Sequence, residues 1–265
     1  MRIVLLVFTL LALVVVYVPL ALVVINSFNS DRTFGWPPAG FTTRWWSAAW
    51  HSGGARDALG VSVLVAIAAT AISLVLGTLA AMALGRYRFF GRNTVSLLII
   101  LPIALPGVVT GLALNNAFRT WFGIELGFAT IVVAHATFCI VTVFNNVQAR
   151  LRRMGTGLEE ASMDLGAGPM RTFVRVTLPQ FRSALLAGGL LAFGLSFDEI
   201  IVTTFTAGPH QQTLPLWIFN NLFRPNQAPV VNVVAAVLVM LSVVPIWLAQ
   251  RISGETGEAV AGGAH

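Results

Sequence analysis

The sequence predicts an all-α membrane protein that crosses the bilayer about six times. Of its 265 residues, 57% are hydrophobic and only 10% are charged, whereas roughly a quarter of the residues in an ordinary soluble domain are charged. The apolar residues also gather in long runs, each near the length of about 20 residues that a helix needs to cross about 30 Å of hydrocarbon. A soluble fold of this size has too little core for so much apolar surface, so lipid is the expected surrounding.

Each apolar run is expected to form one membrane-spanning helix. The first run follows Arg2, as in a signal peptide, but it has about 23 residues and Asn26-Ser27-Phe28 is not a small-residue cleavage site. We therefore expect it to be retained as the first helix. The six expected spans are residues 3–25, 58–84, 95–117, 128–147, 184–205 and 229–249.

The arginines predict the orientation of the chain. All sixteen basic residues are arginines, and eleven lie on one side of the expected membrane against five on the other. The side with more positive charge is cytoplasmic, so both termini are expected in the cytoplasm. The eleven are Arg2, Arg86, Arg88, Arg92, Arg150, Arg152, Arg153, Arg171, Arg175, Arg182 and Arg251.

The net charge of +6 does not indicate a nucleic-acid partner. The basic residues lie between apolar runs and do not gather on one face, as a nucleic-acid surface would require. Cys139 is the only cysteine and lies within an apolar run. Neither an intrachain disulfide nor a cysteine-based metal site is expected.

The outer loop of residues 26–57 is rich in tryptophan. Within it, Thr42-Thr43-Arg44-Trp45-Trp46 is typical of a short amphipathic helix lying at the membrane surface. One interpretation is an aromatic anchor at the level of the lipid headgroups. The other is a docking surface or a cation-facing aromatic, which makes Trp46 a candidate for the substrate pathway.

The inner loop of residues 150–183 is expected to contain two short helices that meet at a glycine corner. Thr156 and Glu159 have the spacing of a capping box at the start of the first helix. Gly166 and Gly168 are expected to supply the left-handed conformations that end a helix.

The second short helix is expected to begin at Pro169, which suits a first helical position, and to reach about Val176. Leu178-Pro179 would end it and start the next span. The corner leaves Met163 and Leu165 facing outward, which favours insertion into a groove on a soluble partner. The residues alone also fit an ordinary connector between spans.

The inner loop resembles the EAA motif of ABC importer permeases. Glu160-Ala161-Ser162, three residues, Gly166, nine residues, Val176, one residue and Leu178-Pro179 are similar to the family pattern of Glu-Ala-Ala, Gly and Ile-x-Leu-Pro. Ser162 and Val176 are mild departures. The resemblance implies that the loop is the coupling region that docks on an ATPase subunit. The implied coupling residues are Glu160, Ala161, Ser162, Asp164, Gly166, Leu178 and Pro179.

Further segments resemble the spermidine/putrescine branch of these permeases, and its second permease subunit in particular. These segments are Leu101-Pro102-Ile103-Ala104-Leu105-Pro106, His135-Ala136-Thr137-Phe138-Cys139, Ser196-Phe197-Asp198-Glu199-Ile200-Ile201-Val202 and Thr213-Leu214-Pro215-Leu216. The resemblance implies a type I (MetI-like) permease fold with cytoplasmic coupling helices, in one permease domain over residues 1–265. It also implies a location in the bacterial cytoplasmic (inner) membrane.

The resemblance also implies the partners. They are a homologous permease that completes a heterodimer, two copies of an ABC ATPase, and an extracytoplasmic substrate-binding protein. The chain has no lysine, so it cannot hold a Gly-rich loop that ends in Gly-Lys-Ser or Gly-Lys-Thr. ATP and magnesium are therefore expected on the ATPase, with no cofactor and no metal on this chain.

Asp198 and Glu199 lie in the middle of the fifth expected span. An ionised carboxylate at mid-bilayer costs about 2.5 to 3.5 kcal/mol or more, which favours a role in holding a polyamine cation. The alternative is a structural ion pair or helix cap at a subunit interface. Ser196 is a weaker candidate on the same segment, because small hydroxyls in membrane helices often bond across helices.

The third expected span contains Pro102 and Pro106 together with Gly107 and Gly111. Proline removes a backbone hydrogen bond, and broken spans usually line cavities, so Pro106 is a candidate for the pathway. A passive kink is the alternative. Close polyamine relatives often carry an acid where this chain has Gly107, so the chain departs from that branch at this position.

Two polar or small-residue features inside the spans have simpler interpretations. His135 in the fourth span is expected to be an interhelical hydrogen bonder more than a proton relay. Gly77 and Ala81 have the small-xxx-small spacing of closely packed helices.

Two other function classes are weighed against an importer subunit. A secondary transporter or channel for a small cation would work without ATPase subunits and would therefore need no coupling loop. An intramembrane enzyme needs convergent groups on separate spans, whereas the two acids are adjacent on one span. No catalytic residue is expected.

Overall fold

The computed structural model describes residues 2–32, 36–224 and 226–240, and over these residues the chain is helical with a single isolated β-bridge between Asn29 and Phe41. In the described part, four helices are long and apolar enough to cross a bilayer, and a bent helix pair makes a fifth candidate. The prediction of an all-α membrane fold is confirmed.

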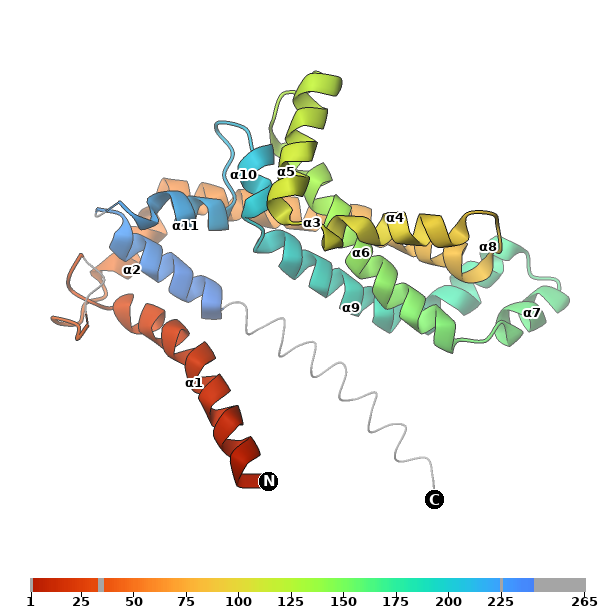
Figure 1. Ribbon diagram of the computed structural model, residues 1–265, viewed down its shortest axis with the longest axis horizontal. Helices are drawn as coiled ribbons and strands as arrows, with labels where there is room; N and C mark the ends of the chain where they lie inside the picture. The colour runs from red at the N-terminus through yellow and green to blue at the C-terminus, as the bar shows by residue number, and fades with distance from the viewer. Residues whose placement is uncertain (1, 33–35, 225, 241–265) are drawn as a thin grey trace. The chain divides into compact units, whose positions relative to one another are not determined.

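The helices form two compact units, residues 1–57 with 216–265 and residues 58–215, and Figure 1 labels the α-helices of both. In chain order the helices are α1 (Arg2–Asn26), α2 (Arg44–His51), α3 (Gly53–Arg86), α4 (Arg92–Ala104), α5 (Gly107–Asn116), the π-helical η1 (Ala117–Trp121), α6 (Phe128–Arg153), α7 (Gly157–Asp164), α8 (Pro169–Thr172), the π-helical η2 (Phe173–Thr177), α9 (Leu178–Phe197), α10 (Ile201–Thr206) and α11 (Leu214–Leu222). A further apolar helix covers Ala228–Met240.

In the first unit, α2 is fastened to the end of α1. The indole Nε1 of Trp45 donates to Asn29 O at 2.9 Å, and the Thr42 amide donates to Phe28 O at 2.7 Å. The ring of Trp46 stacks on Phe28 with centroids 5.1 Å apart. The side chains of residues 4–21 on α1 are exposed, as an apolar helix surrounded by lipid requires.

The sixth expected span, residues 229–249, is covered in part by the helix Ala228–Met240. Residues 241–249 lie outside the described residues.

In the second unit, α6 is the central helix. It packs along α9 and also against α4 and α10. The close approach of α3 depends on Gly77, where a Cβ atom would lie 2.9 Å from Ile140 O and from Val143 Cβ. Ala81, one turn further, is fully buried. The small-residue spacing predicted this contact correctly.

The third expected span is broken. Helices α4 and α5 meet at an angle of 105°, and Leu105 and Pro106 at the break have extended backbone conformations. Pro106 has no N–H to continue the ladder of α4. Pro102, in contrast, remains inside α4.

The fifth expected span is also broken, so the expectation that Asp198 and Glu199 lie in the middle of a helix is wrong. Helix α9 ends at Phe197, and α10 begins at Ile201. Glu199 Oε1 accepts the Val202 amide proton at 2.8 Å. A carboxylate that binds a free N–H at the start of a helix favours a new helix there over continuation of the old one.

Candidate functional site

The inner loop forms a helical corner that ends in a Schellman motif. Helix α7 is followed by Gly166, whose φ of 84° is left-handed. The Gly166 amide donates to Met163 O at 2.9 Å, and the Ala167 amide donates to Ser162 O at 3.1 Å. This is the bond pair that satisfies the last carbonyls of a helix, so the structure has the expected corner at Gly166.

Two expected details of this corner are wrong. Gly168 has φ −69° and ψ 161°, an extended conformation that any residue adopts. Thr156 makes no side-chain cap, and Glu159 does not reach back to it. Glu159 Oε1 instead accepts from Arg86 Nη2 at 2.9 Å, because a guanidinium is a stronger partner for a carboxylate than a backbone N–H.

The expected end of the second short helix is also wrong. Helix α8 does begin at Pro169, but it continues through η2 into α9 without a break, so that residues 169–197 form one helix. The wide π turn of residues 173–177 comes directly before Leu178 and Pro179. A wider turn at this point accommodates the missing N–H and the ring of the proline within a helix.

The corner has one fastened side and one exposed side. The Arg86–Glu159 pair ties α7 to the end of α3, and Ser162 Oγ lies 3.0 Å from Thr172 Oγ1 on α8. Other residues of the corner are exposed, namely four large apolar side chains together with Glu160, Ala161 and Asp164, and Pro179 on α9 is exposed as well. Those apolar residues are Leu158 (62% exposed), Met163 (47%), Leu165 (90%) and Met170 (73%).

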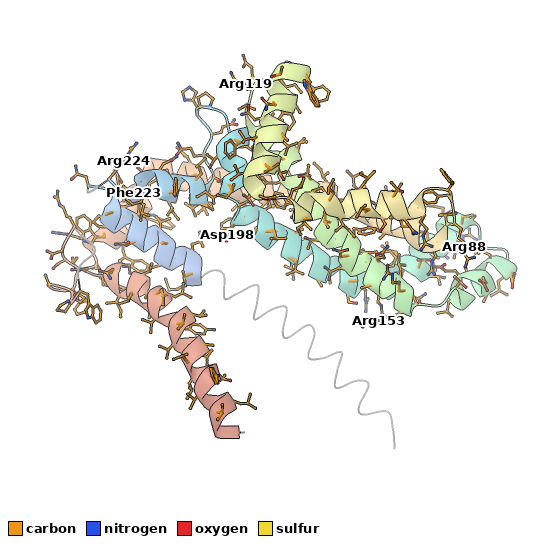
Figure 2. All side chains as sticks on the ribbon, in the orientation of Figure 1. Arg88, Arg119, Arg153, Asp198, Phe223 and Arg224 are labelled. Atoms are coloured by element: carbon orange, nitrogen blue, oxygen red, sulfur yellow. The ribbon has the colours of Figure 1, made fainter. Side chains whose placement is uncertain are left out.

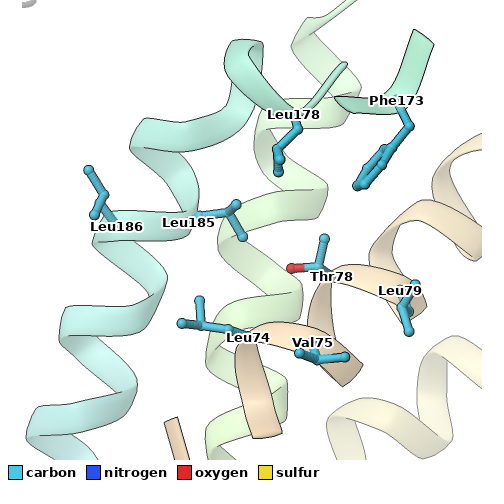
Figure 3. Close-up of a pocket in the computed structure, with 8 residues that line it drawn as sticks. All are labelled: Leu74, Val75, Thr78, Leu79, Phe173, Leu178, Leu185 and Leu186. Atoms are coloured by element: carbon cyan, nitrogen blue, oxygen red, sulfur yellow. The ribbon is translucent and has the colours of Figure 1, made fainter. Parts of the chain in front are cut away.

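Leu178 of the EAA-like pattern is turned inward. It points into an apolar cavity of about 390 Å³ between α3 and the η2–α9 helix (Figure 3). The cavity offers a cation no carboxylate. It is lined by Leu74, Val75, Thr78, Leu79, Phe173, Leu178, Leu185 and Leu186.

The two helix breaks of the second unit lie side by side, because α5 packs on α10 (Figure 1). A Cβ atom on Gly107 would lie 3.3 Å from Ile201 Cγ2, and one on Gly111 would lie 2.6 Å from Phe205 Cδ2. Asn115 Nδ2 donates to Phe205 O at 2.5 Å. Pro106, which immediately precedes Gly107, is thereby held next to the start of α10.

Asp198 and Glu199 occupy the second break, at the C-terminal end of α9 (Figure 2). Asp198 is exposed, and its carboxylate forms no hydrogen bond or ion pair with any described residue. Glu199 is half-buried and uses Oε1 as the cap of α10. Asp198 is therefore the free acceptor of the pair.

Ser196 and Trp46 lie in different surroundings from Asp198. Ser196 is 1% exposed and its Oγ is 2.8 Å from His135 Nδ1, so the structure places it in an interhelical contact. Trp46 belongs to the first contact unit, where it stacks on Phe28.

Sequence reasoning missed the long-range partners of this region. Arg86 and Glu159 are 73 residues apart, and Thr203 bonds to His135 from 68 residues away. No local pattern indicates either pair. Across the described ranges, no group of three or more His, Cys, Asp or Glu residues is placed to hold a metal ion.

Residues 73–254 match the protein family described as "Binding-protein-dependent transport system inner membrane component". The chain is 37% identical over 236 residues to the putrescine transport system permease protein PotI of Escherichia coli (strain K12), covering 86% of this chain and 83% of the relative. It is 34% identical over 247 residues to the spermidine/putrescine transport system permease protein PotC of the same strain, covering 91% and 92%.

Two solved structures show the same fold. A bacterial ABC transporter involved in the import of the acidic polysaccharide alginate has a chain with TM-score 0.68 and 17% identity, over 96% of this chain and 94% of that one. An inward-facing MetNI methionine ABC transporter has a chain with TM-score 0.58 and 22% identity, over 75% and 92%.

Proposed function

This chain belongs to the family of binding-protein-dependent transport system inner membrane components, the membrane subunits of ABC importers, and we propose that the substrate it carries is a polyamine. Relatives at 37% and 34% identity carry the names of putrescine and spermidine/putrescine permeases. Family membership also supports an ABC importer subunit over a channel or secondary transporter that works without ATPase subunits.

The observation that carries the polyamine proposal is the free carboxylate of Asp198 at the meeting point of two broken helices. A broken helix at membrane depth usually lines a cavity or pathway. An exposed carboxylate there, without a partner among the described residues, offers an acceptor to an ammonium group. Glu199, half-buried and bound to the Val202 amide, contributes negative charge from the adjacent position.

The exposed side of the α7–α8 corner supports a second part of the proposal, that the loop docks on an ATPase subunit. Leu158, Met163, Leu165 and Met170 gain little by remaining in water, and Glu160 and Asp164 add exposed charge beside them. The fastened side, through Arg86 and Ser162, would pass a displacement of the corner to α3 and α8.

The complete importer would contain this chain, a homologous permease, two ATPase copies and an extracytoplasmic binding protein. In this assembly both termini and the loop of residues 150–183 face the cytoplasm, in a bacterial inner membrane. The ATPases hold ATP and magnesium, and this chain binds no cofactor. ATP would favour one of two access states of the pathway and hydrolysis the other.

The polyamine proposal is tested with Asp198→Asn in the complete importer reconstituted in proteoliposomes. Uptake of radiolabelled putrescine and spermidine should show a KM raised about tenfold, as for a lost charge-assisted contact, while the ATPase subunits still co-purify. Asp198→Glu, which keeps the charge, is the matched control and should retain most of the uptake. Normal uptake by Asp198→Asn would rule out this carboxylate as a substrate group.

A further inference from the structure

A buried chain of polar groups connects α6 to both sides of the break between α9 and α10. His135 on α6 is fully buried. Its Nδ1 lies 2.8 Å from Ser196 Oγ, near the end of α9, and its Nε2 lies 2.8 Å from Thr203 Oγ1 on α10. We propose that His135 is a positioning residue, which fixes the geometry of this break and thereby the position of Asp198.

The hydrogen bonds of Thr203 define the form of the imidazole. Thr203 Oγ1 donates its single proton to Glu199 O at 2.9 Å, since a carbonyl oxygen can only accept. Towards His135 the same hydroxyl must accept, so Nε2 carries the ring proton. In the neutral ring Nδ1 is then the acceptor, and Ser196 donates to it. One neutral tautomer satisfies every group in the chain.

These contacts connect α6 to the segment where the helical ladder is interrupted. Asp198 N still donates to Gly194 O, and Thr204 N already donates to Ile200 O. Between these two bonds, the Val202 amide donates to the Glu199 carboxylate. Side chains therefore replace part of the backbone bonding at the break.

Any change in the spacing of the two helix ends would leave buried polar atoms unpaired. An unsatisfied buried donor or acceptor costs about 1 to 3 kcal/mol, and the cost rises where water cannot enter. His135 bonds to residues on both sides of the break, so a movement of α10 relative to α9 would break at least one of these bonds. The break is therefore held in one geometry, although Asp198 at its centre is exposed.

The idea that His135 controls substrate affinity rests on the proposed role of Asp198. The idea that His135 holds the geometry of the break does not. His135 does not reach the Asp198 carboxylate in the structure, so it would act only by keeping the residues between Ser196 and Thr203 in place. A transport measurement alone could not distinguish these two effects of His135. The test therefore needs a readout of the break itself.

The test compares three variants in the complete importer. His135→Leu removes both bonds at similar volume, Thr203→Val removes one bond at nearly equal shape, and His135→Gln keeps an acceptor and a donor. Cys139→Ala is the matched control, because the Cys139 thiol lies one turn along α6 and contacts Ala192 O at 3.3 Å, on α9 before the break.

The first readout is amide hydrogen exchange of the peptide that covers residues 196–206, measured in lipid nanodiscs. His135→Leu and Thr203→Val should exchange about tenfold faster there, as expected for loss of a buried hydrogen bond. His135→Gln should fall between them and the parent, and Cys139→Ala should match the parent. Unchanged exchange in both His135→Leu and Thr203→Val would overturn the proposal.

The second readout is uptake of putrescine and spermidine. His135→Leu should raise KM with little change in the maximal rate, and His135→Gln should restore most of the affinity. Faster exchange with an unchanged KM would show that His135 fastens the break but does not control substrate affinity through Asp198. If Asp198→Asn also leaves KM unchanged, the proposed substrate role of Asp198 fails, while the proposed role of His135 in holding the break stands.

Discussion

Two pairs of adjacent acids in this chain divide their roles in the same way. Glu199 is bound to the Val202 amide while Asp198 is free, and Glu159 is bound to Arg86 while Glu160 is exposed. Glu159 and Glu160 are neighbours on helix α7 and point about 100° apart, whereas Asp198 and Glu199 lie in the irregular backbone between α9 and α10. In each pair one acid bonds within the chain, and the other is exposed and is the one that we propose meets an external partner.

The second pair gives a prediction at this scale. Glu159→Gln should lower the unfolding free energy by about 1 to 2 kcal/mol, because it weakens a charged hydrogen bond that is only partly exposed. Glu160→Gln should leave the stability unchanged and instead reduce co-purification of the ATPase. Thermal unfolding of the detergent-purified importer and a pull-down with its ATPase measure the two effects.

A double-mutant cycle separates the ion pair from other effects of the Glu159 substitution. Arg86→Gln combined with Glu159→Gln should be little worse than Glu159→Gln alone, because the contact can be lost only once. Additive losses would mean that the two side chains stabilise the protein independently.

At the scale of elements, the corner between α7 and α8 depends on one backbone conformation. Gly166 has φ 84°, and a Cβ atom there would meet no atom within 4 Å. Gly168 has equally open space but a negative φ of −69°. The two glycines therefore separate the effect of backbone strain from that of added bulk.

This difference predicts the outcome of substituting each glycine with valine. Gly166→Val forces an L-residue into the left-handed region at about 1 to 2 kcal/mol, or about five- to thirtyfold in the population of the correct corner. Substrate-stimulated ATPase activity of the reconstituted importer should fall by a comparable factor, while Gly168→Val should remain near the parent. Equal activities would show that the corner does not couple transport to hydrolysis.

Continuous apolar runs predicted where most of the helices lie. The ranges 3–25, 58–84 and 128–147 fall within α1, α3 and α6, because each helix is apolar throughout its expected core. Hydropathy alone could not locate the break after Phe197, since residues 200–202 are as apolar as the helix before it. That break depends on the Glu199 cap and on His135, which is 61 residues from Ser196.

The sequence also predicted a helix end in the inner loop that the structure does not have. Leu178-Pro179 suggested a helix boundary, yet helix α8 continues through η2 into α9. Proline usually marks a helix start or a kink, but a π turn before it provides a third solution that single-residue preferences do not reveal. Gly166 was easier to predict, because glycine at the end of a helix has a specific conformational purpose.

At the scale of the whole chain, the arginines predict which side of the membrane each loop occupies. In the second unit, Arg88 and Arg153 lie at the end that holds α7, whereas Arg119 lies far from that end, at the tip of the projecting α5–η1 helix (Figure 2). The excess of positive charge at the α7 end is what a cytoplasmic surface requires.

Cysteine labelling tests this orientation, because the only natural cysteine, Cys139, is buried. In the Cys139→Ala background, Leu165→Cys and Trp50→Cys introduce thiols at positions that are 90% and 75% exposed. A membrane-impermeant maleimide should label Trp50→Cys in intact spheroplasts and Leu165→Cys only after permeabilisation. The reverse pattern would invert the topology and remove the α7–α8 corner from contact with any cytoplasmic ATPase.

The unbroken helix of residues 169–197 has a mechanical consequence. Its 29 residues at 1.5 Å per residue make a rod of about 43 Å, and a tilt of about 10° at one end would shift the other by about 7 Å. One end of this rod begins beside the corner that we propose docks on the ATPase, and the other stops at Asp198. A helix of this length would carry a small motion at the corner, through the π turn of residues 173–177, to the carboxylate that we propose binds the substrate.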